Sequence, residues 1–277
     1  MTIPNRKLGR TGVNATILGL GGEGILRSFG HEREAHALIN RAIDLGITYL
    51  ESARAYAGSE SYYGLALGER RNDIFLTSKS HARDKKGALE HLEETLDYMN
   101  TDHLDLWQVH DVRTEDDIQR IFGPHGAIEA FADAKERGLT RFVGVTGHHN
   151  PFVLRKCLEQ YDFDTVLFPV NPAEAAHGGF LDVVMPLARE KKMGMIGMKV
   201  YFRGLAARVP GFLNMDPYLR FALSWPVSTV VIGCDNLRQL EENIRYAHAF
   251  QPMSEEEMKD LMDHISPYAK QLMYYKP

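Results

Sequence analysis

The sequence has little cysteine and no long apolar run. Cys157 and Cys234 are its two cysteines, which are too few for a disulfide framework, an iron–sulfur cluster or a cysteine-rich zinc site. No apolar run reaches the ~18 residues that a membrane span requires, and Met1–Lys7 lacks the apolar core of a secretory signal. These absences predict a protein of the reducing cytoplasm.

The charges are not concentrated in any one part of the chain. Lys and Arg number 32 against 37 Asp and Glu, which gives a formal charge of -5 at pH 7. This balance argues against nucleic acid as a partner and, with no membrane span, predicts a small-molecule partner. Residues 1–277 contain no linker, low-complexity tract or repeat, so we expect a single domain. The sequence predicts no particular oligomeric state.

Short β-rich apolar runs alternate with longer amphipathic stretches along the chain. Eight runs are expected as strands: Thr16–Leu20, Ile47–Glu51, Ile74–Ser78, Leu104–Val109, Phe142–Val145, Thr165–Phe168, Met195–Met198 and Thr229–Ile232. Eight stretches have helical spacing: Glu34–Leu45, Glu60–Glu69, Lys86–Met99, Ala127–Arg137, Pro151–Gln160, Leu181–Lys192, Asp216–Ser224 and Leu237–Phe250. Because such alternation builds parallel βαβ units, the pattern predicts an α/β fold, a closed (β/α)8 TIM barrel.

Two segments fall outside these eight pairs. Lys7–Ile17 contains a Gly9-Arg10-Thr11-Gly12 turn and is expected to form an N-terminal β-hairpin. The stretch from Ser254 to about Lys270 is expected to form an extra C-terminal helix after the barrel.

Ionisable residues follow the ends of consecutive expected strands. Glu51 ends the second strand and Tyr56 lies just beyond it, Lys79 follows the third, and His110 follows the fourth. The C-terminal ends of the strands of such a barrel meet at one mouth, where active sites lie. We therefore expect these four side chains to converge.

A tyrosine, a lysine, a carboxylate and a histidine in one cleft suit proton transfer to a carbonyl oxygen. A phenol is a weak acid with a pKa of about 10, and an adjacent ammonium such as that of Lys79 lowers this pKa. Glu51 would keep Lys79 protonated, and a neutral His110 would orient the carbonyl group. Outside a barrel, the same residues would be ordinary solvated or ion-paired loop residues.

Four segments of the chain resemble the aldo-keto reductase family. Tyr49–Tyr56, which reads YLESARAY, resembles the family's D-[TS]-A-x-x-Y segment, Phe75–Lys79 its lysine strand and Thr101–His110 its histidine strand. Val231–Asn243 is similar to the segment that holds the adenosine end of the cofactor. The resemblance implies an NAD(P)H-dependent reductase in which hydride reaches a carbonyl carbon and Tyr56 protonates the oxygen. NADPH is the expected cofactor, and NADH is the alternative.

The resemblance also implies a cofactor that lies extended across the barrel mouth, without the glycine-rich turn of a Rossmann fold. Its nicotinamide half would lie near Gly22, Thr146, Gly147 and Asn171. Its diphosphate would lie near Lys199, Val200, Tyr201, Arg203 and Gly204. Its adenosine end, at the start of the last barrel helix, would be lined by Gly233, Cys234, Asp235, Arg238, Gln239, Glu242 and Asn243.

Several positions depart from the family pattern. Glu51 stands where the family has aspartate, and its extra methylene displaces the carboxylate by ~1 Å. Thr146-Gly147 replaces Ser-Asn, Leu167 replaces glutamine, and Met198 replaces the aromatic residue that stacks on nicotinamide. These changes keep an alternative open, a nicotinamide-binding sensor or regulatory subunit with weak or no turnover.

The resemblance places the substrate pocket among the loops at the mouth, with Glu23, His81, His148 and Phe202 expected in its lining. These loops are short, which predicts an open pocket for small aldehydes, ketones or dicarbonyl compounds. The pair His148-His149 also suggests a metal-dependent hydrolase, which typically has a His-x-His pair at the end of strand one. The first strand is followed by Gly21-Gly22-Glu23 instead, so no metal is expected.

Overall fold

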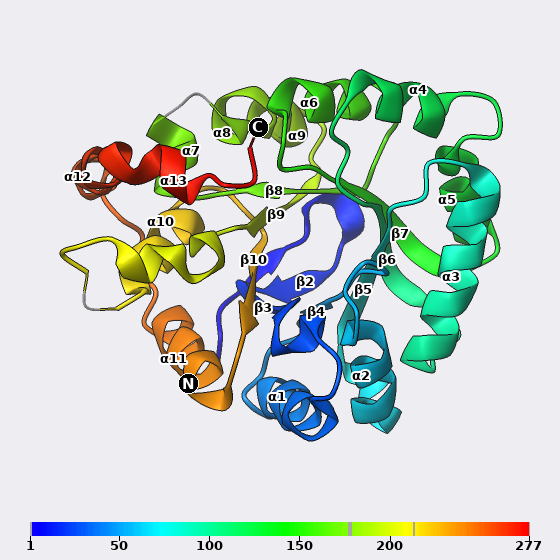
Figure 1. The fold of residues 1–277 in the computed structure, drawn as a ribbon, viewed down its shortest axis with the longest axis horizontal. Coiled ribbons are helices and arrows are strands. Elements are labelled where there is room, and N and C mark those ends of the chain that lie inside the picture. The colour runs from blue at the N-terminus through cyan, green and yellow to red at the C-terminus, as the bar shows by residue number, and fades with distance from the viewer. Residues whose placement is uncertain (1, 177–178, 213, 277) are drawn as a thin grey trace.

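Eight parallel strands form a closed barrel in the computed structural model, which describes residues 2–176, 179–212 and 214–276. Their order around the barrel is β10-β3-β4-β5-β6-β7-β8-β9 (Figure 1). The strands are β3 (Leu18–Gly24), β4 (Tyr49–Glu51), β5 (Phe75–Ser80), β6 (Leu104–Val109), β7 (Thr140–Thr146), β8 (Thr165–Pro169), β9 (Gly194–Met198) and β10 (Thr229–Cys234). The predicted TIM barrel is confirmed, and each expected strand overlaps one of these eight.

Helices surround the barrel (Figure 1). The helices that match the expected stretches are α1 (Glu32–Asp44), α2 (Ser59–Ala66), α3 (Lys85–Met99), α5 (Ala127–Glu136), α6 (Pro151–Gln160), α8 (Phe180–Val183), α9 (Met185–Glu190), α10 (Asp216–Ser224) and α11 (Leu237–His248). Sequence signals set their starts, because the Asp84 side chain caps α3 and Asn150, followed by Pro151, caps α6.

The helices differ from the sequence-based prediction at a few places. Two helices were not predicted: α4 (Glu115–Phe122) after β6 and α7 (Pro172–Ala176) after β8. The capping box of Thr114 and Asp117 is the signal that could have revealed α4. The helix expected at Leu181–Lys192 is two helices, α8 and α9, since Pro186 in the first turn of α9 lacks the N–H that a continuous helix needs.

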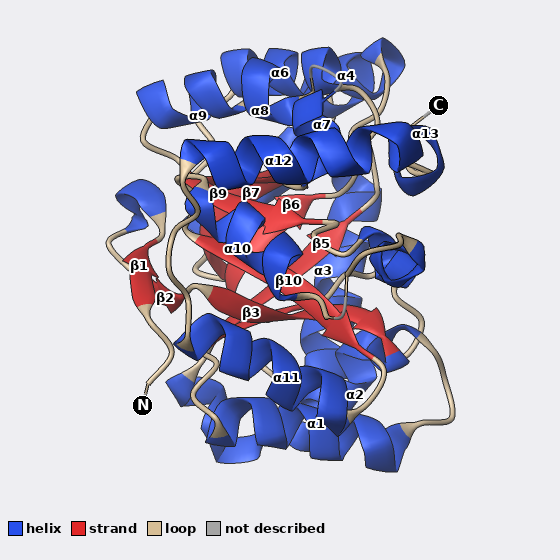
Figure 2. Ribbon diagram, turned by 90° about the vertical axis from the view of Figure 1, so that its left-hand side faces the viewer, coloured by secondary structure: helices blue, strands red, loops and turns tan. Residues whose placement is uncertain are grey.

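The N-terminal hairpin closes one end of the barrel. Strands β1 (Asn5–Lys7) and β2 (Asn14–Thr16) pair antiparallel, as predicted, and lie at the end opposite the C-terminus (Figure 2). The buried side chain of Leu8 joins a cluster inside the barrel with Tyr49, Phe75 and Ile196. Gly9 has a φ of +52°, and a Cβ there would lie 2.1 Å from the Gly194 nitrogen, so this turn requires glycine.

The C-terminal helix is also confirmed, as α12 (Glu255–Ile265) and α13 (Ala269–Leu272), with a 3₁₀ turn between them. The chain then reaches the barrel mouth, where Tyr275 and Lys276 contact Glu174. Among the described residues, no helix has both the length and the apolar character needed to cross a lipid bilayer.

We expect Leu8→Ala to lower the free energy of unfolding by about 2–5 kcal/mol, because it leaves a cavity in a fully buried cluster. Leu65→Ala is the matched control, since Leu65 is 67% exposed on α2, and it should change the free energy by less than about 0.5 kcal/mol. Urea denaturation measures both changes, and equal effects would contradict the role of the hairpin as a barrel plug.

Candidate active site

The barrel brings together the four side chains that end consecutive strands. Glu51 ends β4, Lys79 lies in β5, His110 follows β6 and Tyr56 lies in the turn after β4. The Lys79 Nζ lies 4.9 Å from the centroid of the Tyr56 ring. The rings of Tyr56 and His110 meet edge to face with their centroids 5.8 Å apart. The predicted convergence is therefore seen in the structure.

Lys79 is buried and held by two oxygens. Its side chain is 1% exposed and forms an ion pair with Glu51, and its Nζ donates a hydrogen bond to the Ser52 carbonyl oxygen at 2.7 Å. Burial lowers the pKa of Lys79 well below its usual value, and the Glu23 carboxylate opposes this shift. The contact with Glu51 places a second carboxylate beside the Nζ, and a nearby negative charge favours the ammonium form.

The pKa of Tyr56 does not follow the sequence-based expectation. Burial raises it above its usual value, with a further contribution from Glu23, while the guanidinium groups of Arg27 and Arg203 oppose the rise. Lys79 lies against the ring face, and the Arg27 Cζ lies 5.0 Å from the ring centroid. The net shift keeps the phenol protonated at neutral pH, which is the form that a proton donor requires.

His110 is neutral at physiological pH. Burial lowers its pKa well below the usual value, and the charge of Lys79 adds to this effect. Its Nδ1 is buried and has no hydrogen-bond partner among the described residues. A neutral imidazole carries one N–H donor, so His110 can hydrogen bond to a carbonyl oxygen beside Tyr56.

The residue Arg83, which sequence reasoning missed, fixes the segment after β6. Its guanidinium donates to the carbonyl oxygens of His110 at 2.9 Å and of Asp111 at 2.8 Å. Its Nε donates to the carboxylate of Asp117 at 2.7 Å. Asp111 has a φ of +54°, a conformation that is uncommon outside glycine but that aspartate tolerates better than most residues, and these contacts hold it. No sequence motif indicates this role of Arg83.

Two cavities meet at Tyr56. The smaller, of about 450 Å³, is lined by Tyr56, Lys79, His110 and side chains from the loops after β5, β6 and β7. The larger, of about 780 Å³, extends from Tyr56 over the end of β9 to the start of α11. Residues shared by the two linings are Glu23, Arg27, Tyr56, Leu167, Met198, Lys199 and Arg203. A small molecule in one cavity can therefore contact a molecule in the other.

Three cations share one carboxylate at the junction of the cavities. Arg27 donates a hydrogen bond to Glu23 at 2.8 Å. The Arg203 Nη2 and the Lys199 Nζ lie 3.4 Å and 3.6 Å from the same carboxylate. Burial lowers the pKa of Lys199, and Glu23 opposes this. The four groups carry a formal charge of +2, so the junction attracts anions.

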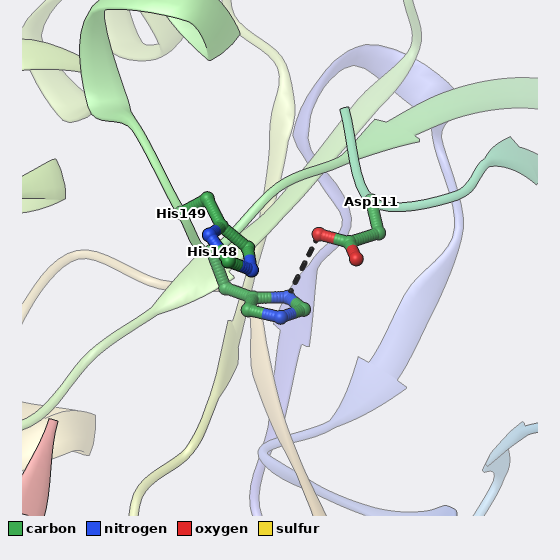
Figure 3. A group of neighbouring side chains, drawn as sticks. All are labelled: Asp111, His148 and His149. Carbon is green, nitrogen blue, oxygen red and sulfur yellow. Dashed lines mark ion pairs between the residues drawn. The ribbon is translucent and has the colours of Figure 1, made fainter. Parts of the chain in front are cut away.

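Asp111, His148 and His149 form a polar wall of the smaller cavity (Figure 3). One carboxylate oxygen of Asp111 lies 3.2 Å from the His148 Nδ1, and the other binds the Arg113 guanidinium through Nε at 2.6 Å. Burial lowers the pKa of His148 to about 4, although Asp111 opposes the shift. Burial also lowers the pKa of His149, so both rings are neutral at physiological pH.

Most residues expected at the adenosine end line the far part of the larger cavity: Gly233, Asp235, Arg238, Gln239, Glu242 and Asn243. Cys234 is buried instead and its sulfur accepts a hydrogen bond from Asn243 at 3.5 Å. Asn236 caps the helix α11, whose first backbone N–H groups favour anionic ligands. Val200, Tyr201 and Gly204 also line this cavity.

Other expected site residues support the cavities without lining them. A Cβ on Gly22 would lie 2.8 Å from the Tyr56 ring, so glycine lets the tyrosine pack there. The Asn171 side chain donates to the Tyr275 hydroxyl at 3.0 Å. Gly147 lies outside both linings, whereas Thr146 and His81 line the smaller cavity.

Phe202 does not lie where the sequence reading expected it. Its side chain is fully buried and packs edge to face on Tyr218 with ring centroids 6.1 Å apart. A φ of +51° at Phe202 accompanies this inward orientation. The expectation that Phe202 contacts substrate is therefore withdrawn.

A buried carboxylate, that of Glu174 on α7, attaches the C-terminal tail to the mouth. The Tyr275 hydroxyl donates to Glu174 at 2.9 Å, and the Lys276 Nζ lies 2.7 Å from the other oxygen. This attachment makes Tyr274 and Tyr275 part of the smaller cavity's lining. Its sequence signal is weak, because the partners lie about a hundred residues apart.

The glycines of β3 have the spacing of a dinucleotide-binding motif. Gly19, Gly21 and Gly24 read G-x-G-x-x-G, but the motif needs a strand that turns directly into a helix. Here all three glycines lie within β3, and a 3₁₀ turn follows them. The spacing therefore does not indicate a Rossmann site.

The model of the Aldo/keto reductase family matches residues 17–207. The chain is 26% identical to the uncharacterized oxidoreductase YqkF of Bacillus subtilis over 94% of this chain and 95% of that protein. It is 28% identical to L-galactose dehydrogenase of Arabidopsis thaliana over 86% of each.

Solved structures give the same picture of the fold. The holo form of aldo-keto reductase AKR11C1 from Bacillus halodurans is similar, with a TM-score of 0.80, 24% identity, and coverage of 95% of this chain and 96% of that one. An aldo-keto reductase from Klebsiella pneumoniae in complex with NADPH has a TM-score of 0.77 at 18% identity, over 96% of each chain.

The pKa of His148 predicts a pH-dependent stability. The pKa of His148 is about 4 in the folded protein, whereas that of an unfolded histidine is about 6.5. Between these pH values the unfolded chain therefore binds more protons. Stability therefore falls as the pH falls through this window. In His148→Asn, we expect the loss of unfolding free energy between pH 7 and pH 5 to be smaller by about 2 kcal/mol.

Urea denaturation at several pH values measures this difference. His36→Asn is the control, because His36 is exposed on α1 and its ring is hydrated in both states. A pH dependence of stability in His148→Asn that equals that of the unmutated protein would contradict the burial of a neutral His148.

Proposed function

Because the chain belongs to the aldo/keto reductase family of oxidoreductases, we propose that it reduces aldehyde and ketone carbonyls to alcohols with NADPH. Tyr56 is the proton donor, and the substrates are small molecules. The observation that carries the proposal is the meeting of Tyr56, Lys79 and His110 in the smaller cavity, at the point where Tyr56 also lines the larger one. One cavity suits a substrate and the other a dinucleotide.

The charges at the junction fit a dinucleotide. Arg27, Lys199 and Arg203 exceed the charge of Glu23 by two, which matches the two negative charges of a diphosphate. Lys199 is largely covered, with 13% of its side chain exposed, and it shares the single Glu23 carboxylate with two arginines, so the three cations lack a full set of counter-charges. We therefore assign these three cations to the diphosphate, with Val200, Tyr201 and Gly204 beside it.

The remaining assignments divide the cofactor between the two ends of the larger cavity. Leu167 and Met198 line both cavities together with Tyr56, and Thr146 lines the smaller one; these three residues are proposed for the nicotinamide end. Gly233, Asp235, Gln239, Glu242 and Asn243 are proposed for the adenosine end. Arg238 is 80% exposed there and supplies a cation for a 2′-phosphate, which favours NADPH over NADH.

In the proposed reaction, each buried group has a separate role. The bound nicotinamide supplies hydride to the carbonyl carbon. His110 donates its N–H to the carbonyl oxygen and orients it, and the Tyr56 phenol transfers its proton to that oxygen as negative charge develops there. The ammonium of Lys79, held by Glu51, stabilises the phenolate that remains.

Tyr56→Phe removes the proton and keeps the ring, so we expect kcat to fall by about 10²–10⁴-fold while the Kd for NADPH stays within about twofold. NADPH and NADH oxidation is followed with aldehydes, α-dicarbonyls and ketones, and binding is followed by fluorescence in the same samples. Binding without turnover in the unmutated protein would favour a cofactor-binding sensor instead.

Lys199→Gln tests the diphosphate assignment. Removal of one charge-assisted contact should raise the Kd for NADPH by about tenfold, with a smaller dependence of binding on salt. Lys270→Gln on α13 is the control, since Lys270 is exposed and lines neither cavity. An unchanged Kd in Lys199→Gln would remove Lys199 from the cofactor site.

A further inference from the structure

The wall formed by Asp111, His148 and His149 has no role in the proposed cofactor site or proton transfer, and of the three only His148 was expected in the substrate pocket. It lies in the smaller cavity with Tyr56 and His110, and it comes from the loops after β6 and β7 (Figure 3). Asp111 directly follows His110 in the chain. A substrate group that binds at this wall would therefore be attached to a carbon atom near the carbonyl carbon.

One oxygen of Asp111 is left for a ligand. Arg113 occupies Oδ2 through Nε at 2.6 Å and through a second guanidinium nitrogen. Oδ1 is buried and has no hydrogen-bond partner among the described residues, although the His148 Nδ1 lies 3.2 Å away. Because a buried carboxylate oxygen without a donor is unfavourable, this atom requires a donor from water or from a ligand.

The two imidazoles beside it can both donate and accept hydrogen bonds. His148 and His149 are neutral, as their lowered pKa values require, and a neutral ring has one N–H and one lone pair. The wall thus offers a carboxylate acceptor and two donor–acceptor rings, which is the complement of alcohol O–H groups, since each is also both donor and acceptor.

Anions and metal ions fit this wall less well. Its cation, Arg113, is already paired with Asp111 by two nitrogens, so an additional anion finds no unpaired charge. For a divalent metal ion, the Arg113 guanidinium already occupies one oxygen of Asp111 and places a positive charge beside the three ligands. A neutral polar ligand remains.

The rest of the cavity is equally polar. The apolar members of its lining are Ala55, Leu167 and Met198, whereas the other members carry charges, imidazoles or hydroxyls. A hydrocarbon chain would remove water from these groups without replacing their hydrogen bonds. A hydroxylated chain would replace them.

We propose that Asp111, His148 and His149 form a hydroxyl-binding subsite, which makes a polyhydroxylated aldehyde or ketone the preferred substrate. The hydroxyl next to the carbonyl carbon, or the one after it, donates to Asp111 Oδ1, and the neighbouring hydroxyls hydrogen bond to the two imidazoles. This inference rests on the proposed reductase function and specifies its substrate class.

The test compares substrates that share a carbonyl and differ in hydroxyls. Glyceraldehyde and propanal form one pair, erythrose and butanal another, with kcat/KM corrected for the free aldehyde fraction. In the unmutated protein, we expect the hydroxylated member of each pair to be preferred by at least ~10-fold. Equal kcat/KM values within a pair would overturn the proposal.

Variants of the wall show which residues cause the preference for the hydroxylated substrates. Asp111→Asn and His148→Phe should each bring the ratio within a pair to about twofold or less, because kcat/KM falls more for the hydroxylated member than for its partner. The Kd for NADPH should change by less than about threefold. Asp116→Asn, exposed at the start of α4, should keep the full preference. A parallel loss for both members of a pair would assign these residues a structural role and overturn the proposal.

Two further experiments distinguish a hydroxyl-binding subsite from a metal site and from an anion site. Stoichiometric zinc or iron that is retained by the unmutated protein and lost in His148→Phe would overturn the hydroxyl subsite in favour of a metal site. A preference for glyoxylate over glyceraldehyde that disappears in Arg113→Gln would overturn it in favour of an anion site. Turnover of propanal that depends on Tyr56 supports the reductase function whichever subsite is found, so the two proposals fail separately.

Discussion

The ion pair between Lys79 and Glu51 is the interaction on which the site depends. Two neighbouring strands, β4 and β5, pair in register from Tyr49 with Phe75 to Glu51 with Thr77, and this pairing brings the two charges together in the barrel. A buried ammonium without such a partner would lose its proton. With the partner, the Lys79 Nζ lies 4.9 Å from the centroid of the Tyr56 ring, where its ammonium form would stabilise the phenolate that the proposed reaction leaves.

Charge also divides the mouth of the barrel into two regions. Around Glu23, the cations exceed the carboxylate, and this region opens toward the start of α11. Around Asp111, the charges are balanced by Arg113 and the histidines are neutral. The first region suits a dianionic group and the second suits a neutral polar molecule. Tyr56 lines both cavities where the two regions meet, and in the proposed reaction this division would order cofactor and substrate about it.

The sequence predicts the barrel and the strand-end residues well, because both depend on local patterns. Lys79 and His110 are found by position alone once eight strands are expected. The structure corrects what depends on distant parts of the chain. Phe202 points into the core and packs on Tyr218, with a positive φ, which no local pattern in the sequence indicates. Arg83 and Glu174 act through partners that lie far along the sequence, and no local motif marks them. The direction of the Tyr56 pKa depends on burial, which a sequence does not give.

In the proposed reaction, one carbonyl group at the barrel mouth receives both a hydride and a proton. The most direct measurement is a single turnover with excess protein, NADPH deuterated at the transferred C4 position, and a small hydroxyaldehyde. We expect NADPH oxidation that is slower with deuterium than with hydrogen, and an alcohol that carries the deuterium on its former carbonyl carbon. Bound NADPH that stays reduced in the presence of every aldehyde and ketone offered would contradict the account.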